Sequence, residues 1–256
     1  MIGANLKSIL ERLPQGVRLV AVSKFHPASA VREAYEAGQR IFGESRPQEL
    51  EAKAAVLPSD IEWHFIGHLQ TNKLKKVLPY VTMVESIDSF HLLEAVSRWG
   101  LDHSRPIDIL LELHLGAEQT KQGFTEDEIL EIVRAQSVSV PPTVAVAPQP
   151  TSANVPASFA DALQPTSAGE PPAASFPGVR IRGLMGMATN TPDESVVKAD
   201  FERIAALWRR IRSEHPALRD TFTELSIGMS ADWPLAVASG STLVRIGTAI
   251  FGSRSY

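Results

Sequence analysis

The most constraining feature of this sequence is a regular alternation of short apolar runs with segments of helical period. Strands that alternate with helices form a parallel sheet, either open or closed. The chain has 256 residues, which suits one (β/α)8 TIM barrel domain over residues 1–256. A doubly wound sheet is the alternative, but its Gly-rich first turn is missing here. Eight apolar runs predict the buried strands, at residues 18–24, 40–44, 62–67, 81–87, 107–114, 179–187, 222–228 and 243–247.

The segments between the runs carry helix start and stop signals. Gly38 is placed to end the helix that precedes it. Thr125 and Glu128 form a capping box. Thr191 is expected as the N-cap of a long helix, with Pro192 at its first position. An extra N-terminal helix is expected to close the outer ring of helices. Its predicted apolar face contains Ile2, Leu6, Ile9, Leu10 and Leu13.

Residues 138–178 differ from the rest of the chain in composition. This segment holds half of the 18 prolines and only two charged residues, Asp161 and Glu170. A segment rich in Pro, Ala and Ser has too few large apolar side chains to offset the conformational entropy that the chain loses on ordering. It predicts a flexible, disordered insertion within the barrel. Because the insertion leads into the amino end of a strand, we expect it to lie away from the carboxyl ends of the strands.

Composition excludes several classes of protein. The formal net charge is −4, with 44% hydrophobic and 21% charged residues, which argues against nucleic acid or an anionic membrane as the main partner. The chain has no cysteine, so disulfides, thiolate nucleophiles and Cys-type zinc sites are excluded. Its first residues include Lys7, Glu11 and Arg12, unlike a signal peptide. We therefore expect a cytoplasmic protein without a membrane span.

Polar residues follow several of the predicted strands. In a barrel the carboxyl ends of the strands share one face, and sites lie there. Lys24 follows the first strand, while the seventh and eighth end in "SIGMS" (226–230) and "RIGTA" (245–249). A single Gly/Ser turn usually has no role in binding a ligand. Two of them, after strands seven and eight, predict backbone N–H groups that can hold a phosphate.

Lys24 has two interpretations. It could extend into solvent, as most lysines do. Its apolar preceding run and the nearby phosphate turns favour a second interpretation, because a desolvated amine attacks carbonyl groups. Proteins bind pyridoxal 5′-phosphate (PLP) through a lysine amine beside a phosphate site.

Arg245 could then face the pyridine nitrogen, or it could form an ion pair in the barrel wall. A Schiff-base aldolase with a carbonyl substrate remains an alternative.

The histidines of "HFIGH" are a weaker signal. His64 and His68 have i,i+4 spacing, but Gly67 and the strand pattern argue against the helix that would align them on a metal. We expect no metal site. His64 is instead predicted to make a polar contact near the ligand.

Seven ordered motifs lie along the chain: "AVSKFHP", "IFGESRPQE", "WHFIGHLQTNK", "TKQGF", "GLMGMAT", "LSIGMSADW" and "GSTLVRIGTAIFG". They resemble those of the pyridoxal phosphate homeostasis proteins, which are PLP-binding relatives of the alanine racemase N-terminal barrel. Two differences stand out: Ser45 and Arg46 replace Asn-Tyr of many members, and Ile227 replaces a common methionine. Residues 138–178 are not a recognised feature of that family.

The resemblance implies a (β/α)8 barrel with PLP held as an aldimine on Lys24 and with Arg245 near the ring nitrogen. It implies a monomeric protein that buffers, carries or delivers PLP to PLP-dependent apo-enzymes, without catalytic residues of its own. The implied phosphate contacts are Ser226, Gly228, Met229, Gly247 and Thr248.

The alternative is a PLP-dependent amino-acid racemase. Barrel racemases have a second domain that supplies a catalytic tyrosine. We expect no such domain here, since the chain ends soon after the eighth strand and none of Tyr35, Tyr80 and Tyr256 follows a predicted strand within the barrel.

Overall fold

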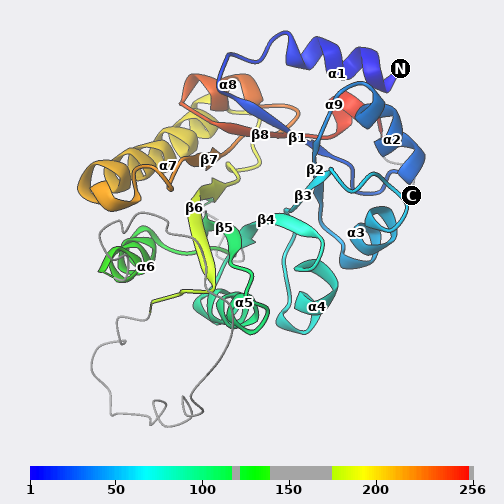
Figure 1. Ribbon diagram of the computed structural model, residues 1–256. Coiled ribbons are helices and arrows are strands. Elements are labelled where there is room, and N and C mark those ends of the chain that lie inside the picture. The colour runs from blue at the N-terminus through cyan, green and yellow to red at the C-terminus, as the bar shows by residue number, and fades with distance from the viewer. Residues whose placement is uncertain (117–121, 139–174, 254–256) are drawn as a thin grey trace.

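The computed structural model describes residues 1–116, 122–138 and 175–253. Within them, eight strands form a closed parallel barrel in sequence order, with β1 paired to both β2 and β8 (Figure 1). All eight predicted strands and the predicted TIM barrel are confirmed. The strands are β1 (Arg18–Val22), β2 (Ile41–Glu44), β3 (Glu62–Phe65), β4 (Val81–Ile87), β5 (Ile107–Leu113), β6 (Val179–Gly186), β7 (Glu224–Ser226) and β8 (Leu243–Ile246).

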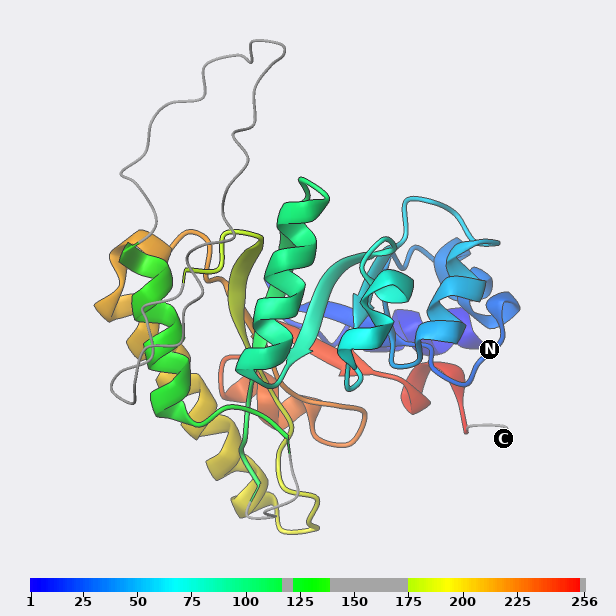
Figure 2. The ribbon, with the colours of Figure 1, turned by 90° about the horizontal axis from the view of Figure 1, so that it is seen from below.

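Helices surround the barrel, and α6 lies beside α7 (Figure 2). None of the helices in the described ranges is long and apolar enough to cross a lipid bilayer. The helices are α1 (Ile2–Leu10), α2 (Ala28–Glu36), α3 (Pro47–Ala54), α4 (Leu74–Val77), α5 (Phe90–Asp102), α6 (Glu126–Val138), α7 (Glu194–Glu214), α8 (Trp233–Ala238) and α9 (Thr248–Phe251), with 3-10 turns η1 (Thr71–Lys73) and η2 (Pro216–Leu218).

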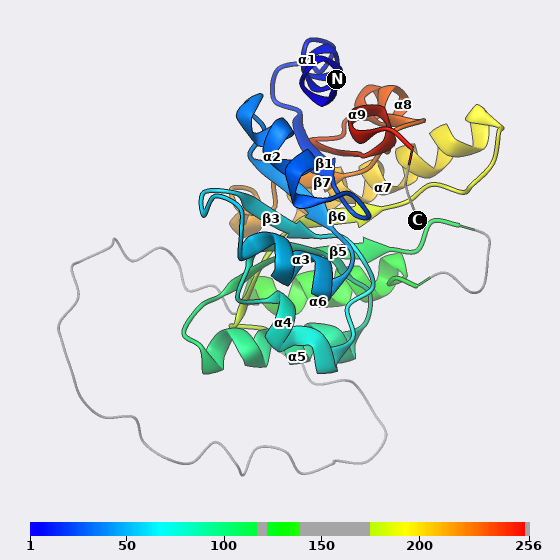
Figure 3. The same ribbon diagram turned by 90° about the vertical axis from the view of Figure 1, so that its right-hand side faces the viewer.

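The N-terminal helix closes the outer ring, as predicted. Helix α1 packs against α2 and against α9, a short helix after β8 that the sequence pattern did not predict (Figure 3). Leu6 and Ile9 are buried on its inner face, but Leu10 is 42% exposed, so its placement on that face was wrong. The helix ends at Leu10, and Leu13 packs against the core from beyond that end.

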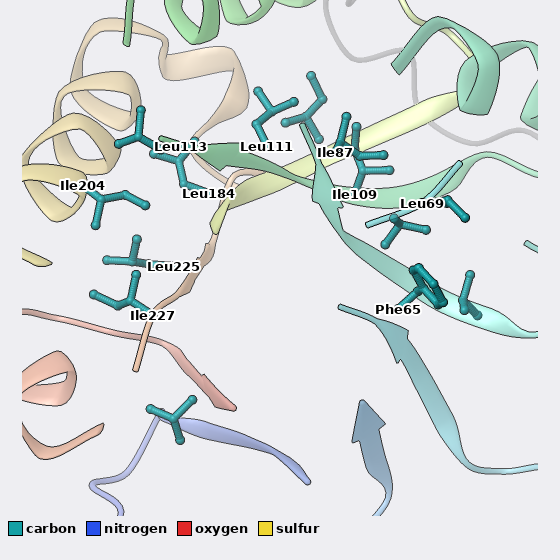
Figure 4. Packing of buried hydrophobic residues seen from close by; sticks show 14 of the residues in the cluster. Phe65, Leu69, Ile87, Ile109, Leu111, Leu113, Leu184, Ile204, Leu225 and Ile227 are labelled. Carbon is teal, nitrogen blue, oxygen red and sulfur yellow. The ribbon is translucent and has the colours of Figure 1, made fainter. Parts of the chain in front are cut away.

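The main core lies between the strands and the helices. Because side chains alternate along a strand, every second residue faces this layer. Leu111, Leu113 and Leu184 face outward there, and Leu113 and Leu184 lie near Ile204 of α7 in the same cluster (Figure 4). The intervening residues face the barrel interior, where Met83, Leu110 and Met185 form a separate small apolar cluster. This alternation decides which polar side chains enter the barrel.

Two helix caps follow the predictions and one does not. Gly38 has φ +103° just beyond α2, and the Thr125 and Glu128 side chains bond each other's backbone N–H groups. The long helix α7, however, begins at Glu194 with Asp193 as its N-cap, not at Thr191. Thr191 Oγ1 instead accepts a hydrogen bond from Asp193 N at 3.2 Å, which forms a turn ahead of the helix.

The predicted boundaries of the insertion need correction at both ends. Helix α6 continues to Val138, and Phe176 is 4% exposed within the core. Gly178 N donates to Ser97 Oγ at 3.1 Å, next to the start of β6. These residues therefore belong to the barrel, on the side where its strands begin. Residues 139–174, including the predicted disorder, lie outside the described residues.

Candidate functional site

A chain of buried polar side chains crosses the barrel interior. His64 Nδ1 on β3 lies 2.6 Å from Glu85 Oε1 on β4, and Ser226 Oγ on β7 donates to Glu85 Oε2 at 2.6 Å. Arg245 Nη1 on β8 donates to Ser226 O at 2.8 Å and to Ser226 Oγ at 2.5 Å. Its Nη2 donates to Gly186 O at 2.9 Å. The exposure of these four side chains is 4% or less, so the network is fixed in a dry interior.

The electrostatics of this network depend on Glu85. Burial raises the pKa of its carboxyl, but the hydrogen bond from His64 and the charges of His64 and Arg245 outweigh burial. The pKa of Glu85 therefore lies below its ordinary value, and the group is a carboxylate. This assigns the Nδ1 proton to His64 as the donor toward Glu85. Arg245 Nη1 donates to Ser226 Oγ and lies 3.7 Å from Glu85 Oε2.

The turns after β7 and β8 are tied together. Gly247 N donates to Ser230 Oγ at 3.1 Å, and Arg245 N donates to Gly228 O at 2.9 Å. Gly228 has φ +93°, and a Cβ there would lie 2.5 Å from Ala236 Cβ, so only glycine fits. Thr248 opens α9, so its N–H has no acceptor within that helix. The two predicted phosphate turns thus form one surface.

Lys24 lies at the same end of the barrel. The β1–β2 ladder extends to Ser23, whose N–H donates to Gly43 O at 3.0 Å. Lys24 follows in a turn that His26 N closes on Ser23 O at 3.1 Å, and its side chain is half-buried. A Cβ on Gly247 would lie 3.0 Å from Val22 O, so the end of β1 packs directly against the β8 turn.

The structure therefore brings the eight predicted positions to the carboxyl end of the barrel. His64 is part of the group through Glu85 rather than alone, while His68 pairs with Asp88 at 2.8 Å. Among the residues that the structure describes, no three His, Asp or Glu side chains converge as metal ligands do. The positions brought together are Lys24, His64, Ser226, Gly228, Met229, Arg245, Gly247 and Thr248.

Two acidic residues were missed by the sequence interpretation. Neither Glu85 nor Glu112 was given a role from the sequence. Glu112 is 7% exposed on β5, where burial and the charge of Asp88 raise the pKa of its carboxyl to about 7 against the opposing charge of Arg245. An acid within an apolar strand is the signal that could have found both. Glu112 lines a cavity of about 320 Å³ with Leu113, Leu115, Gln122, Met187, Ala188, Asn190 and Met229.

Two of the three residues that differ from the family pattern, Ile227 and Arg46, have clear roles. Ile227 is fully buried in the main core, as expected of a swap for methionine. The Arg46 guanidinium stacks 4.2 Å from the ring centre of Phe25 and lies 3.5 Å from Glu49. Arg46 therefore braces the turn that carries Lys24.

Known proteins are similar to this chain over most of its length. The family model described as the N-terminal domain of alanine racemase matches residues 1–140. The pyridoxal phosphate homeostasis protein of Vibrio alginolyticus is 33% identical, covering 96% of this chain and 90% of its own. The mouse protein of the same name is 34% identical, covering 100% of this chain and 88% of its own. The chain belongs to the pyridoxal phosphate homeostasis protein family.

Solved structures place this family member among alanine-racemase-like barrels. PipY of Synechococcus elongatus is 34% identical, covering 98% of this chain and 100% of its own. Its TM-score is 0.79 without PLP and 0.76 with PLP bound. Alanine racemase of Bartonella henselae, at 15% identity, covers 99% of this chain and 58% of its own with a TM-score of 0.66. That likeness concerns the fold alone.

Proposed function

We propose that the carboxyl end of the barrel binds PLP, with Lys24 as its covalent anchor and the β7 and β8 turns as its phosphate site. The observation that carries this proposal is the packing of the Lys24-bearing end of β1 against Gly247, whose turn is bonded to Ser230. PLP supplies an aldehyde that joins covalently to a primary amine. Lys24 follows the strand end that packs against the β8 turn, so we assign it as that amine.

The residues present fit this cofactor. Gly228, Met229, Gly247 and Thr248 line the surface that the two turns form, and the N–H of Thr248 has no acceptor within α9. The N–H groups of Met229 and Gly247 donate to Asp232 Oδ1 and Ser230 Oγ in this structure, so each must leave that acceptor to bind a phosphate. Ser226 has its hydroxyl committed to Glu85 and Arg245, so we assign it to orienting Arg245 rather than to the phosphate.

We assign Arg245 and His64 to the ring end of the site. A buried Arg245 beside a pyridine nitrogen keeps that nitrogen unprotonated and weakens the ring as an electron sink. His64, held by Glu85, lines the same interior. Both features favour a protein that holds its cofactor over one that reacts with it.

The function that follows is PLP homeostasis, in which the protein stores PLP and releases it. Its support is the name shared by relatives 33% and 34% identical over nearly the whole chain, together with PipY, whose structure contains PLP. The proposal also includes a monomeric, cytoplasmic protein with PLP-dependent apo-enzymes as acceptors. Transfer from the loaded protein to an apo-enzyme, in the presence of a scavenger of free PLP, tests delivery. Complete interception by the scavenger would contradict direct delivery.

Covalent binding is tested by adding PLP, reducing with borohydride and measuring the intact mass and the visible spectrum. We expect one PLP per chain in the native protein and none covalently attached in Lys24→Ala or Lys24→Arg. Lys75→Ala is the matched control, because Lys75 is exposed on α4, and it should load normally. A native protein that takes up no PLP, or a Lys24→Ala protein that is still labelled, refutes the proposal.

A further inference from the structure

The two peptide groups that flank Lys24 are both held by charged side chains of α3. Lys53 Nζ donates to Ser23 O at 2.9 Å, on the peptide group that precedes Lys24. Glu49 Oε2 accepts from Phe25 N at 2.7 Å, on the peptide group that follows it. The two α3 side chains also contact each other at 3.3 Å. Side chains of one helix thus hydrogen-bond the peptide groups on both sides of Lys24.

Lys53 also belongs to a buried network of charged side chains between the strands and helix α3. Lys53 is only 5% exposed and lies 2.6 Å from Glu44 Oε1 on β2, which also accepts from Ser23 Oγ at 2.6 Å. Strand alternation directs Ser23 outward to this network. A lysine is rarely buried unless it is paired, and its removal would leave the Glu44 carboxyl in a dry environment. The arrangement is therefore specific, not incidental.

The turn itself requires external support. Phe25 has φ +68°, a left-handed conformation that is unfavourable for a residue with a Cβ. The Arg46 guanidinium covers its ring, and the bond from Phe25 N to Glu49 fixes its peptide group. Non-glycine residues keep such a conformation where the surroundings over-determine it, and those surroundings here belong to α3 and the residue before it.

We infer that Lys53 and Glu49 are positioning residues for Lys24: they fix its backbone so that its amine meets the cofactor in one orientation. The inference rests on the proposed function, since it assumes that Lys24 is the anchor. Neither side chain needs to touch PLP. The prediction is a loss of covalent capture without a loss of phosphate binding.

The experiment compares two measurements on each variant. The first is the rate of covalent attachment of PLP, followed by absorbance and confirmed by mass after reduction. The second is the affinity for pyridoxine 5′-phosphate, which has the phosphate and ring but no aldehyde. We expect Glu49→Ala to slow attachment by about tenfold, the effect of one charge-assisted hydrogen bond, with analogue affinity unchanged. Glu49→Gln keeps an acceptor oxygen for Phe25 N and should recover most of the rate.

Two further variants complete the test. The double variant Glu44→Gln/Lys53→Met removes both buried charges and should slow attachment as Glu49→Ala does. Glu51→Ala is the control, since Glu51 lies on α3 but its side chain is 44% exposed and contacts Lys76 instead.

The outcomes separate the two proposals. Failure of the native protein to attach PLP refutes the proposed function. Normal attachment in Glu49→Ala and in the double variant, or a parallel loss of analogue affinity, refutes the positioning role.

Discussion

The raised pKa of Glu112 can be tested through the pH dependence of protein stability. Its carboxyl is 7% exposed, and its pKa of about 7 compares with an ordinary value of 4.5. Burial is the largest cause, Asp88 adds repulsion, and Arg245 offsets part of both. The perturbation is Glu112→Gln in the cofactor-free protein, which keeps the shape of the side chain and removes its ionisation.

The magnitude follows from proton linkage. Because the folded protein holds this proton to a higher pH than the unfolded chain does, stability falls as pH rises between 4.5 and about 7 and is level outside that window. At 1.36 kcal/mol per pH unit, the full cost of ionising Glu112 is about 3 kcal/mol. About 2.5 kcal/mol of it is incurred between pH 5 and pH 8.

The assay is urea unfolding of both proteins at pH 5 and pH 8. The free energy of unfolding of Glu112→Gln minus that of the native protein should increase by about 2.5 kcal/mol over this interval. Taking the difference removes the contribution of other titrating groups. Glu94→Gln, on the exposed side of α5, controls for the substitution itself. A difference that stays constant from pH 5 to pH 8 would show that Glu112 is solvated, and the reasoning would fail.

Two other substitutions test the site. Gly228→Ala places a Cβ 2.5 Å from Ala236 Cβ at φ +93°, so unfolding experiments should show a loss of about 1–2 kcal/mol or more, and titration should show weaker PLP binding; unchanged values for both would contradict the assigned turn. Arg245→Met removes the guanidinium that faces the buried Glu85 carboxylate and leaves His64 as its remaining partner, at a cost of up to about 3–5 kcal/mol in urea unfolding, and the double variant with Glu85→Gln should recover part of it. Additive losses in the double variant would contradict the coupling.

The fold was predictable because buried parallel strands have continuous apolar sequences. All eight runs contain a strand of the barrel, including the three-residue β7, and Lys24 and both Gly turns lie where those strands end. Helix starts and segment boundaries were harder to predict, because neighbouring residues can make alternative local hydrogen bonds. Thr191 and Asp193 can each accept a hydrogen bond from the N–H two residues on, and the sequence does not say which one caps α7. Likewise, Pro-rich composition concealed Phe176, a single aromatic residue that enters the core.

The contacts that organise the site could not be predicted from local pattern. Glu85 and Ser226 are 141 residues apart in the sequence and lie on strands that are not neighbours in the barrel. Alternation shows that both face inward, but it does not select a partner across the interior.

The same limit applies on the outer side of β1. Ser23 faces the helices because Leu19 and Ala21, which share its side of the strand by alternation, also face them. Its bond to Glu44 and the contact from Lys53 depend on how α3 packs. Consecutive residues at this strand end thus serve two layers: the outward residue is held by helix α3, and the next residue is the proposed anchor. A change on α3 can therefore reach the site through the backbone of Lys24, without contacting the cofactor.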